Sequence, residues 1–416
     1  MKIRKKLILI EAEMKGPKGH FLNNLIDTTK AFNNKFNIYW ILNKNFEDNG
    51  TYIPKNINIK KIVDTNKYKR KKNKILYLLE EIYIFFLNLT NIIKFLPIFF
   101  KEKKLFKFLI ALKSNFFLLP RYFDSFYKTY KLLKLTENDH IFFPTARRKD
   151  IALINFLTKI DPNHPKLHIR VMLPPKNKFK GFFYYLRKID KQLTNERAFV
   201  YLWSDFNYKL FIKNSISKKG IFKSNIPWTF FKRKLKIKNH IIGYMGDARP
   251  SRGFQYLPDI IEKLEIKKYH LKFLIQFSKI SNDLIETKQR LYKLSKKNKN
   301  IKIIEKYLDY QKYINHLKKI DIMPIMHNAD EINKVTSGTM YSCIPYEIPM
   351  VISSNTLFMK RILKFKSYEK AKNIGDFANK IIKISKNYKY YHSNVRKNSL
   401  ILRKILRDDP LRKNMT

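Results

Sequence analysis

The sequence contains a single cysteine, Cys343, among its 416 residues. One thiol excludes an intramolecular disulfide framework, and it also excludes a zinc site built from cysteines, which needs two to four of them. A chain so poor in cysteine is typical of a reducing compartment. The basic start is followed by only four apolar residues, Leu7 to Ile10, before Glu11. A secretory signal needs roughly seven or more, so we expect no signal peptide and interpret this stretch as a buried strand.

Several motifs that carry common chemistries are also absent. The sequence has no G-x-x-x-x-G-K-[ST] phosphate loop, no G-x-S-x-G nucleophile elbow and no H-E-x-x-H zinc motif. Each of these motifs places a reacting group or a metal ion at a fixed spacing that its chemistry requires. Their absence argues against a P-loop NTPase, an α/β-hydrolase and a zinc protease of these types.

Acidic residues are few: 33 stand against 87 basic residues, for a net charge of +54. Such a balance favours polyanionic partners, namely nucleic acid, anionic lipid or phosphorylated substrates. Lys, Asn, Ile, Phe and Tyr are all abundant, so a coding bias toward A and T explains much of the excess equally well. The lysines are scattered rather than gathered in one arm or tail. We therefore expect no specific nucleic-acid partner and keep nucleic-acid binding as the weaker alternative.

Short apolar stretches alternate with stretches of helical spacing along the chain. This alternation predicts an α/β protein with parallel sheets that are covered on both faces. A polar, basic segment over 216–238 contains Gly220 and Pro227 and is interpreted as a linker. The predicted strands are residues 7–13, 37–43, 57–64, 139–146, 167–175, 198–205, 240–247, 269–278, 300–308, 321–326 and 349–353. The tail from about 377 to 407 is predicted to be helical.

The segment 75–118 has a different pattern. Its apolar residues step by three and four, as expected for an amphipathic helix: Ile75, Leu79, Ile82, Phe86, Leu89, Ile93 and Leu96. Three interpretations remain open. A bilayer span over 82–100 has the required length but carries polar residues and Pro97. A basic amphipathic element resting on an anionic membrane is the second, and a helix pair packing on the core or in a dimer is the third.

Two predicted strands run into glycine-containing loops that precede helical spacing. The loops hold Gly16 and Gly19 in the first half of the chain, and Gly243 and Gly246 in the second. Free backbone N–H groups and a helix dipole at such a place favour an anion. Glycine is common in turns of this kind, so the loops alone are weak evidence.

The second loop, GYMGDARPSRGF, adds Arg249 and Arg252. Paired guanidinium groups match the planar acceptor edges of a diphosphate through forked hydrogen bonds. The sequence therefore predicts a diphosphate site at this loop. The alternative is two solvated surface arginines in a very basic protein.

The stretch YMGDARPSRGFQYLPDII resembles the donor loop of GT-B glycosyltransferases, especially those similar to glycosyltransferase family 4. In that family an Arg or Lys precedes a final glycine before the helix, and the loop grips the diphosphate of a nucleotide sugar. Arg252 stands at that basic position before Gly253, and Arg249 lies near the other basic position. The resemblance therefore assigns both arginines to the donor.

Further stretches resemble the same family in the same order. KGHFLNN resembles the N-terminal glycine loop, and NIPW resembles the interdomain linker. The strand DIMPIM matches the family's Asp–apolar–Pro strand. Thr336, Ser337 and Gly338 match the Ser-Gly that starts the helix over the donor. No D-x-D triplet occurs, whereas many sugar transferases of the other common fold hold a metal with one.

One feature of the family is missing. Its helix over the donor carries two glutamates eight positions apart, and these fall near Lys334 and at Ser342 in this sequence. Glu331 and Glu347 flank the motif, so a shifted acid is a possible replacement. The histidine often found after a middle strand of the first domain is also missing, and that place holds Pro144, Thr145 and Ala146.

The resemblance implies two Rossmann-like domains facing across a cleft, the GT-B architecture. We expect an N-terminal acceptor domain over 1–215 with a basic helical insertion over about 75–130. The linker over 216–238 leads to a nucleotide-sugar-binding domain over 239–385. A C-terminal helix over 386–416 is expected to pack back on the N-terminal domain.

The resemblance also implies a hexosyltransferase-like enzyme that moves a sugar from a nucleotide-sugar donor to a cell-surface polysaccharide or a lipid-linked glycan. We expect it to need no metal and no cofactor, because arginine and a helix dipole stabilise the departing diphosphate, and to retain anomeric configuration. Arg249, Arg252 and His20 are the predicted catalytic residues. The predicted donor contacts are Gly19, Gly246, Gln276, Ser337, Gly338, Thr339 and Ser342.

The expected location is the cytoplasm, with peripheral contact to the inner face of the plasma membrane. The motivation is the basic, aromatic-rich segment 75–118 together with the net charge of +54. The main alternative is a binding protein that kept the GT-B fold and lost catalysis, which the missing acidic pair supports.

Overall fold

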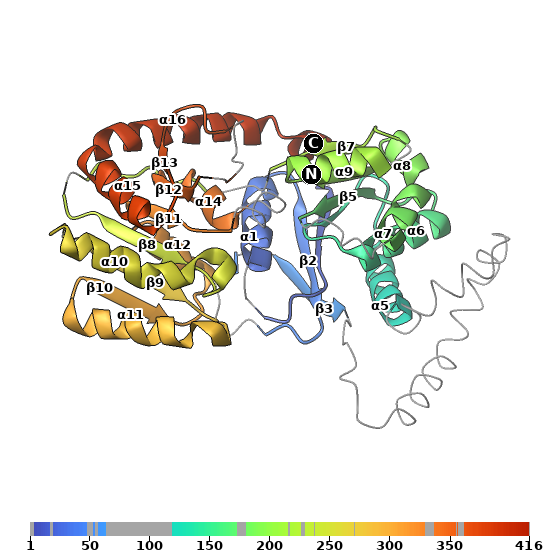
Figure 1. The fold of residues 1–416 in the computed structure, drawn as a ribbon. Coiled ribbons are helices and arrows are strands. Elements are labelled where there is room, and N and C mark those ends of the chain that lie inside the picture. Colours follow the sequence, from blue (N-terminus) through green and yellow to red (C-terminus); the bar gives the residue numbers. More distant parts are fainter. Residues whose placement is uncertain are drawn as a thin grey trace, which may run out of the picture. The chain divides into compact units, whose positions relative to one another are not determined.

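The computed structural model describes residues 4–16, 20–47, 53–54, 57–63, 119–172, 180–214, 217–225, 229–236, 238–269, 271–328, 337–354, 356 and 362–415. The chain forms two compact units, Met1–Lys223 with Met415 and Ser224–Asn414 with Thr416 (Figure 1). Each unit is an α/β body built on parallel strands. The predicted amphipathic segment 75–118 lies outside the described residues.

The first unit contains a seven-stranded parallel sheet in the order β3-β2-β1-β4-β5-β6-β7. Its strands are β1 (Lys6–Glu11), β2 (Asn37–Asn43), β3 (Asn58–Val63), β4 (His140–Phe143), β5 (Lys166–Val171), β6 (Ala198–Leu202) and β7 (Ile221–Lys223). The described helices are α1 (His20–Phe32), α5 (Leu119–Leu132), α6 (Arg148–Ile160), α7 (Lys180–Lys188), α8 (Asp190–Thr194) and α9 (Asp205–Asn214). The strand order reverses between β1 and β4. In open α/β sheets, ligands bind at the carboxyl ends of the strands beside such a reversal.

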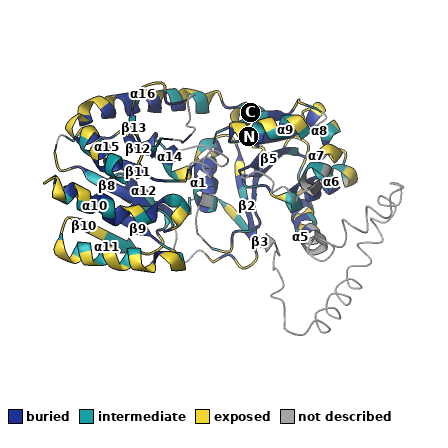
Figure 2. Ribbon diagram, in the orientation of Figure 1, coloured by how far each residue is buried: buried dark blue, intermediate teal, exposed yellow. Residues whose placement is uncertain are grey.

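The central strands form the core of both units, and Figure 2 shows most of them as dark blue arrows. Every residue of β4 and of β6 is buried. Near-continuous burial is expected for parallel strands, because helices cover both faces of the sheet. Exposed residues follow the outer faces of helices such as α10 (Leu257–Ile266) and α11 (Ile285–Lys297).

A chain of aromatic and imidazole rings crosses the first sheet. His140 on β4 and His168 on β5 share a hydrogen bond of 2.9 Å, and a second bond of 2.9 Å joins His168 to the Tyr201 hydroxyl on β6. Burial lowers the pKa of His140 to about 4 and that of His168 well below its usual value. Both rings are therefore neutral at physiological pH, and they act as polar parts of the core.

The second unit has two three-stranded parallel sheets, in the orders β10-β9-β8 and β11-β12-β13. The strands are β8 (Ile241–Met245), β9 (Lys272–Phe277), β10 (Ile301–Glu305), β11 (Met323–Ile325), β12 (Met350–Ser353) and β13 (Tyr368–Ala371). A parallel bridge between Ile242 and Ile322 joins the two sheets along β8 and β11. The combined order matches the doubly wound Rossmann arrangement, with its reversal between β8 and β11.

The remaining described helices of this unit are α12 (Tyr310–Leu317), α14 (Gly338–Cys343), α15 (Ile374–Lys386), α16 (Tyr388–Arg407) and α17 (Pro410–Asn414). The predicted helical tail is two helices, α15 and α16, which meet at Asn387. Asn398 on α16 accepts a hydrogen bond from the Phe365 amide at 2.9 Å, so this helix has contacts within the second unit. Its packing on the first domain stays a prediction.

Two observed strands lie outside the predicted ones. Strand β7 falls inside the predicted linker over 216–238 and pairs with β6, so the first unit continues to Lys223 rather than ending at 215. Strand β13 lies in a polar, lysine-rich stretch and is buried only at alternate positions. Three- and four-residue strands in polar surroundings carry too little periodicity to be recognised in a sequence.

A buried ion pair connects the segment after β7 to the residues just before β11. Arg233 donates from Nη1 to Asp321 Oδ1 at 3.1 Å and from Nη2 to the Leu317 carbonyl at 2.9 Å. The side chains of Arg233 and Asp321 are only 5% and 3% exposed. Glu347 Oε2 accepts from the Arg233 backbone N–H at 3.1 Å and from Arg396 Nε at 3.3 Å. This network fixes the incoming chain and helix α16 against the strands.

Candidate functional site

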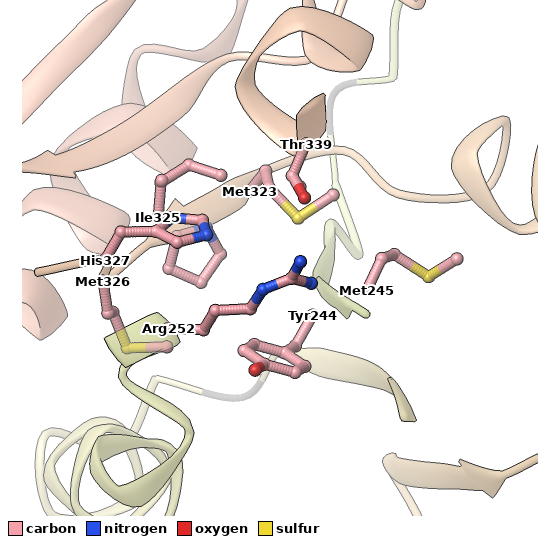
Figure 3. Close-up of a pocket in the computed structure, with 9 residues that line it drawn as sticks. Tyr244, Met245, Arg252, Met323, Ile325, Met326, His327 and Thr339 are labelled. Carbon is pink, nitrogen blue, oxygen red and sulfur yellow. The ribbon is translucent and has the colours of Figure 1, made fainter. Parts of the chain in front are cut away.

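A pocket lies where the strand order of the second unit reverses. The ends of β8 and β11 form two of its walls, which is where an α/β sheet of this kind binds its ligand. The lining residues are Tyr244, Met245, Arg252, Met323, Pro324, Ile325, Met326, His327 and Thr339. Figure 3 shows the Arg252 guanidinium, the Thr339 hydroxyl and the His327 ring around the same space.

Arg252 supplies the positive charge of this pocket. It ends a short 3-10 turn, η1 (Pro250–Arg252), and its side chain is half-buried. Among the residues that the structure describes, none forms a hydrogen bond or ion pair with its guanidinium group. A guanidinium at a switch point that no described residue binds is suited to an anionic ligand.

Two glycines allow Arg252 to reach the pocket. Gly246 has φ +129°, and a Cβ atom there would collide with Arg252 Nη1. Gly253 has φ +71°, and a Cβ atom there would collide with Met326. Both backbone conformations are ones that residues with a side chain rarely adopt. A side chain at either position would therefore displace Arg252 or the loop that carries it.

The loop differs from the predicted arrangement in one respect. The sequence suggested that the glycines lead directly to a helix N-terminus, but two 3-10 turns, η1 and η2 (Phe254–Tyr256), come first. The α-helix, α10, begins only at Leu257. Pro250 and the left-handed Gly253 interrupt the regular helical hydrogen bonds here.

Gln276 supports the turn at Gly246. Its Oε1 accepts from the Gly246 N–H at 3.2 Å, and its backbone carbonyl accepts from the same N–H at 3.1 Å. Its Nε2 donates to the Lys306 carbonyl at 2.8 Å. Both ends of this buried amide thus bind the protein, so Gln276 is placed as a support of the loop. Its predicted contact with the donor stays a prediction.

The second predicted arginine does not line the pocket. Arg249 is exposed, and its Nη2 lies 2.6 Å from Asp247 Oδ2. Asp247 in turn accepts from the Ser278 hydroxyl at 3.0 Å. The structure thus separates the two arginines: Arg252 enters the pocket, and Arg249 pairs with Asp247 at the surface.

Of the predicted donor contacts on α14, one lines the pocket. Thr339 is a lining residue, whereas Ser337 caps the helix by accepting from the Met340 N–H at 3.3 Å. Gly338 is exposed, and a Cβ atom there would meet open space. Ser342 is buried and donates to the Gly338 carbonyl at 2.9 Å.

His327 is a pocket residue that the sequence analysis missed. It lies two residues after the end of β11, and its Nδ1 atom is buried without a hydrogen-bond partner among the described residues. Burial, and secondarily the charge of Arg252, lower its pKa to about 3, so the ring is neutral. The available signal was its place right after the strand DIMPIM, at the carboxyl edge of the sheet where ligands bind.

The acid that the family resemblance calls for is not found among the described lining residues. Glu347 is 3% exposed and is bound to Arg233 and Arg396, so it does not take that role. Glu331 and Lys334 lie outside the described residues. Among those described, no group of three His, Cys, Asp or Glu side chains has the arrangement of a metal site.

The predicted acceptor residues of the first unit are only partly described. Gly19 lies outside the described residues, and His20 begins α1 with its side chain outside them. The switch point between β1 and β4 instead presents Glu11, whose Oε1 accepts from the Thr145 hydroxyl at 2.6 Å. Thr145 occupies the place where the family often has a histidine. Burial, and to a smaller extent Asp150, raise the pKa of Glu11 to about 8.

Glu11→Gln should make the stability of the first unit less sensitive to rising pH. A carboxyl whose pKa is raised by folding stabilises the folded state fully below its pKa in the unfolded chain, about 4.5. That stabilisation is lost as the pH rises to the folded-state pKa of about 8. Between about pH 5 and pH 7.5 the wild type should lose about 3 kcal/mol that the variant retains. Urea unfolding, followed through the fluorescence of Trp40 and Trp203, measures the difference.

Glu13→Gln is the matched control, because Glu13 is partly exposed and paired with Lys149. Between about pH 5 and pH 7.5 its stability should fall in parallel with that of the wild type. The histidines with lowered pKa values affect all three proteins equally and cancel. If Glu11→Gln and the wild type lost stability in parallel, the Glu11 carboxyl would already be ionised in the folded protein.

No protein-family model matches the sequence, and no curated protein matches it. Solved structures match nearly the whole chain. Sucrose-phosphate synthase from Thermosynechococcus elongatus has 9% identity over 97% of this chain and 95% of that chain, with a TM-score of 0.57. HepE from Anabaena, in complex with UDP, has 12% identity over 97% of this chain and 99% of that chain, with a TM-score of 0.57. The chain has the GT-B fold.

The same GT-B fold occurs in a protein assigned as a UDP-N-acetylglucosamine 2-epimerase from Listeria monocytogenes. It has 12% identity over 97% of this chain and 95% of that chain, with a TM-score of 0.57. Identities this low establish the fold and leave the reaction open, because one fold hosts different chemistries. The resemblance to glycosyltransferase family 4 therefore stays a resemblance. Among the described residues, no helix is both long and apolar enough to cross a bilayer.

Proposed function

We propose that this GT-B protein is a glycosyltransferase that binds a nucleotide sugar in the pocket of its second unit. The observation that carries the proposal is Arg252, a guanidinium without a described partner at the switch point between β8 and β11. A diphosphate is an anion that fits, because two oxygen atoms of a phosphate group accept forked hydrogen bonds from one guanidinium. The Thr339 hydroxyl lines the same pocket and is a second group that can bind a phosphate or sugar oxygen.

Arg252 has a role in the chemistry as well as in binding. When the sugar leaves, negative charge builds up on the nucleoside diphosphate, and a fixed guanidinium stabilises that charge. This favours a reaction that needs no metal ion and no cofactor. A front-face reaction with retention needs little from a side-chain base, so it agrees with a pocket in which no acid is found among the described lining residues.

The acceptor we propose is a cell-surface polysaccharide or a lipid-linked glycan. The net charge of +54 supports contact with an anionic membrane surface at the inner face of the plasma membrane. Cosedimentation with anionic vesicles at moderate salt tests this part separately. If the protein stayed wholly in solution, the proposed membrane contact would be wrong. The proposed donor site would not be affected by that result.

Calorimetric titration of UDP, GDP and ADP, at moderate salt and without divalent metal, tests the donor site. We expect one nucleotide to bind clearly tighter than the other two, because a base pocket discriminates where a diphosphate site does not. Binding of all three alike would indicate simple attraction to a basic protein, and no binding would end the glycosyltransferase proposal.

A binding protein without catalysis is the second candidate, and the absence of an acid among the described lining residues is the observation that favours it. The matching nucleotide sugar separates the two candidates. A transferase releases nucleoside diphosphate from it when offered acceptor, and slowly by hydrolysis without one. A protein that only binds would leave the nucleotide sugar intact over the same time.

A further inference from the structure

His327 shares the pocket with Arg252 and has an unused nitrogen atom. Its Nδ1 is buried and has no hydrogen-bond partner in the part of the chain that the structure describes, although buried polar atoms are nearly always paired in native proteins. The ring and the guanidinium line the same pocket, as Figure 3 shows. Since neither this nitrogen nor the guanidinium has a partner among the described residues, we infer that a ligand forms hydrogen bonds with both.

We propose that His327 takes up a proton when a diphosphate group binds against Arg252, so that nucleoside diphosphate binding in this pocket is coupled to proton uptake. This inference rests on the proposed function, since it assumes that the pocket receives a diphosphate. The protonated ring would donate a hydrogen bond from Nδ1 to a phosphate oxygen, which satisfies the unpaired atom.

The physical reason is a reversal of the electric field at the ring. Without a bound anion, burial and the Arg252 charge both disfavour the imidazolium, and the pKa of His327 lies at about 3. A diphosphate carries at least two negative charges, and an opposite charge within about 4–6 Å favours the protonated ring. With the ligand bound, the net charge around the ring therefore attracts the added proton instead of repelling it.

The other titratable groups of the pocket do not compete for the proton. Among the described lining residues, only Tyr244 titrates besides His327 and Arg252. Burial raises the pKa of Tyr244 above its usual value, although Arg252 opposes the shift. Tyr313, which also interacts with Arg252, has its pKa raised to about 12 by burial. Both hydroxyls remain neutral between about pH 5 and pH 8, so His327 is the group that changes charge.

The consequence concerns product release. A nucleoside diphosphate, the product of the proposed reaction, would bind more tightly as pH falls and leave more readily as pH rises. If the bound ligand restores the pKa of His327 to its ordinary value of 6.5, affinity should rise about tenfold from about pH 7.5 to about pH 5.5. The ligand's own protonation weakens binding over the same range, so the comparison must be made against a variant.

The test is calorimetry with whichever of UDP, GDP and ADP binds the wild type tightest. Each titration is repeated in two non-phosphate buffers that differ in ionisation enthalpy. The difference between the two measured binding enthalpies gives the number of protons taken up on binding. His327→Gln keeps a polar side chain that cannot titrate in this range. His316→Gln is the matched control, because His316 on α12 is partly exposed, does not line the pocket and is bound to the Lys312 carbonyl.

We expect the affinity of the wild type, divided by that of His327→Gln, to rise about tenfold as pH falls over this range. The wild type and His316→Gln should take up more protons on binding than His327→Gln does. Should His327→Gln fail to fold, ring-nitrogen NMR of the wild type replaces it. The His327 nitrogens should then change from neutral to protonated shifts at about pH 6 when the nucleotide is added.

Two negative outcomes are distinguishable. If no nucleotide binds the wild type, the proposed function fails and this inference fails with it. If one binds and Arg252→Ala weakens it, but His327→Gln shows the wild-type pH profile and proton count, the donor site stands and only the inference is overturned.

Discussion

Arg252→Ala weakens binding of the preferred nucleoside diphosphate by about 1.5–3 kcal/mol, which is roughly tenfold to 150-fold in Kd. The reason is the loss of charge-assisted hydrogen bonds from a guanidinium that no described residue engages in the protein itself. Because no described partner is left behind unpaired, the effect on folding stability should be small. Calorimetry at one pH and moderate salt measures the change, and thermal unfolding verifies that the variant is folded.

Arg249→Ala is the matched control for this prediction. It removes the same charge from the same loop, but Arg249 is 54% exposed and paired with Asp247. We expect its Kd to change less than about threefold, since exposed pairs contribute little. Equal losses in the two variants would mean that general attraction between a basic protein and an anion explains the binding, and that the pocket does not.

Arg233→Ala destabilises the second unit by about 3–5 kcal/mol, because it removes the buried cation that pairs with the Asp321 carboxylate and leaves the half-exposed Lys236, at 3.0 Å, as its only described charged partner. The substitution also removes the bonds to the Leu317 and Tyr346 carbonyls. Asp321 accepts from the Ile241 N–H at 2.8 Å, at the start of β8, so the loss should reach the edge of the pocket. Hydrogen exchange of peptides from β8 to β13, with urea titration, measures the loss in this unit.

Arg290→Ala is the control for the buried pair. Arg290 also bonds two acids, Asp259 and Glu262, but it lies on the surface with its side chain 46% exposed. The expected loss is below about 1 kcal/mol. Similar losses of unfolding free energy for the two variants would mean that burial does not decide how much these ion pairs contribute.

Much of the fold was predictable because its signals are local. Apolar runs such as residues 37–43 and 198–205 are bounded by polar and turn residues, and they become β2 and β6 with nearly the expected ends. The alternation with helical spacing requires parallel strands and crossovers, which leaves few topologies. The donor loop was recognisable for the same reason, since Gly246, Arg252 and Gly253 stand close together in the chain.

The remainder of the site depends on contacts between distant segments. His327 lies beside Arg252 only because β11 adjoins β8, a pairing that no local pattern encodes. The two predicted arginines look alike in sequence, but Arg249 is extended before the 3-10 turn η1 and Arg252 ends that turn, so their side chains leave the loop at different places. In the sequence Glu347 is a candidate for the missing acid, but in the structure it is bound to Arg233, which lies 114 residues earlier.

The sequence by itself thus determined the α/β class, most of the strands and the loop that presents a guanidinium. These follow from periodicity and from the conformational freedom of glycine, which act over a few residues. Only the tertiary structure decided which arginine enters the pocket, which histidine joins it and which glutamate is already bound. Those outcomes depend on which strands lie side by side and on which polar groups must find partners once they are buried.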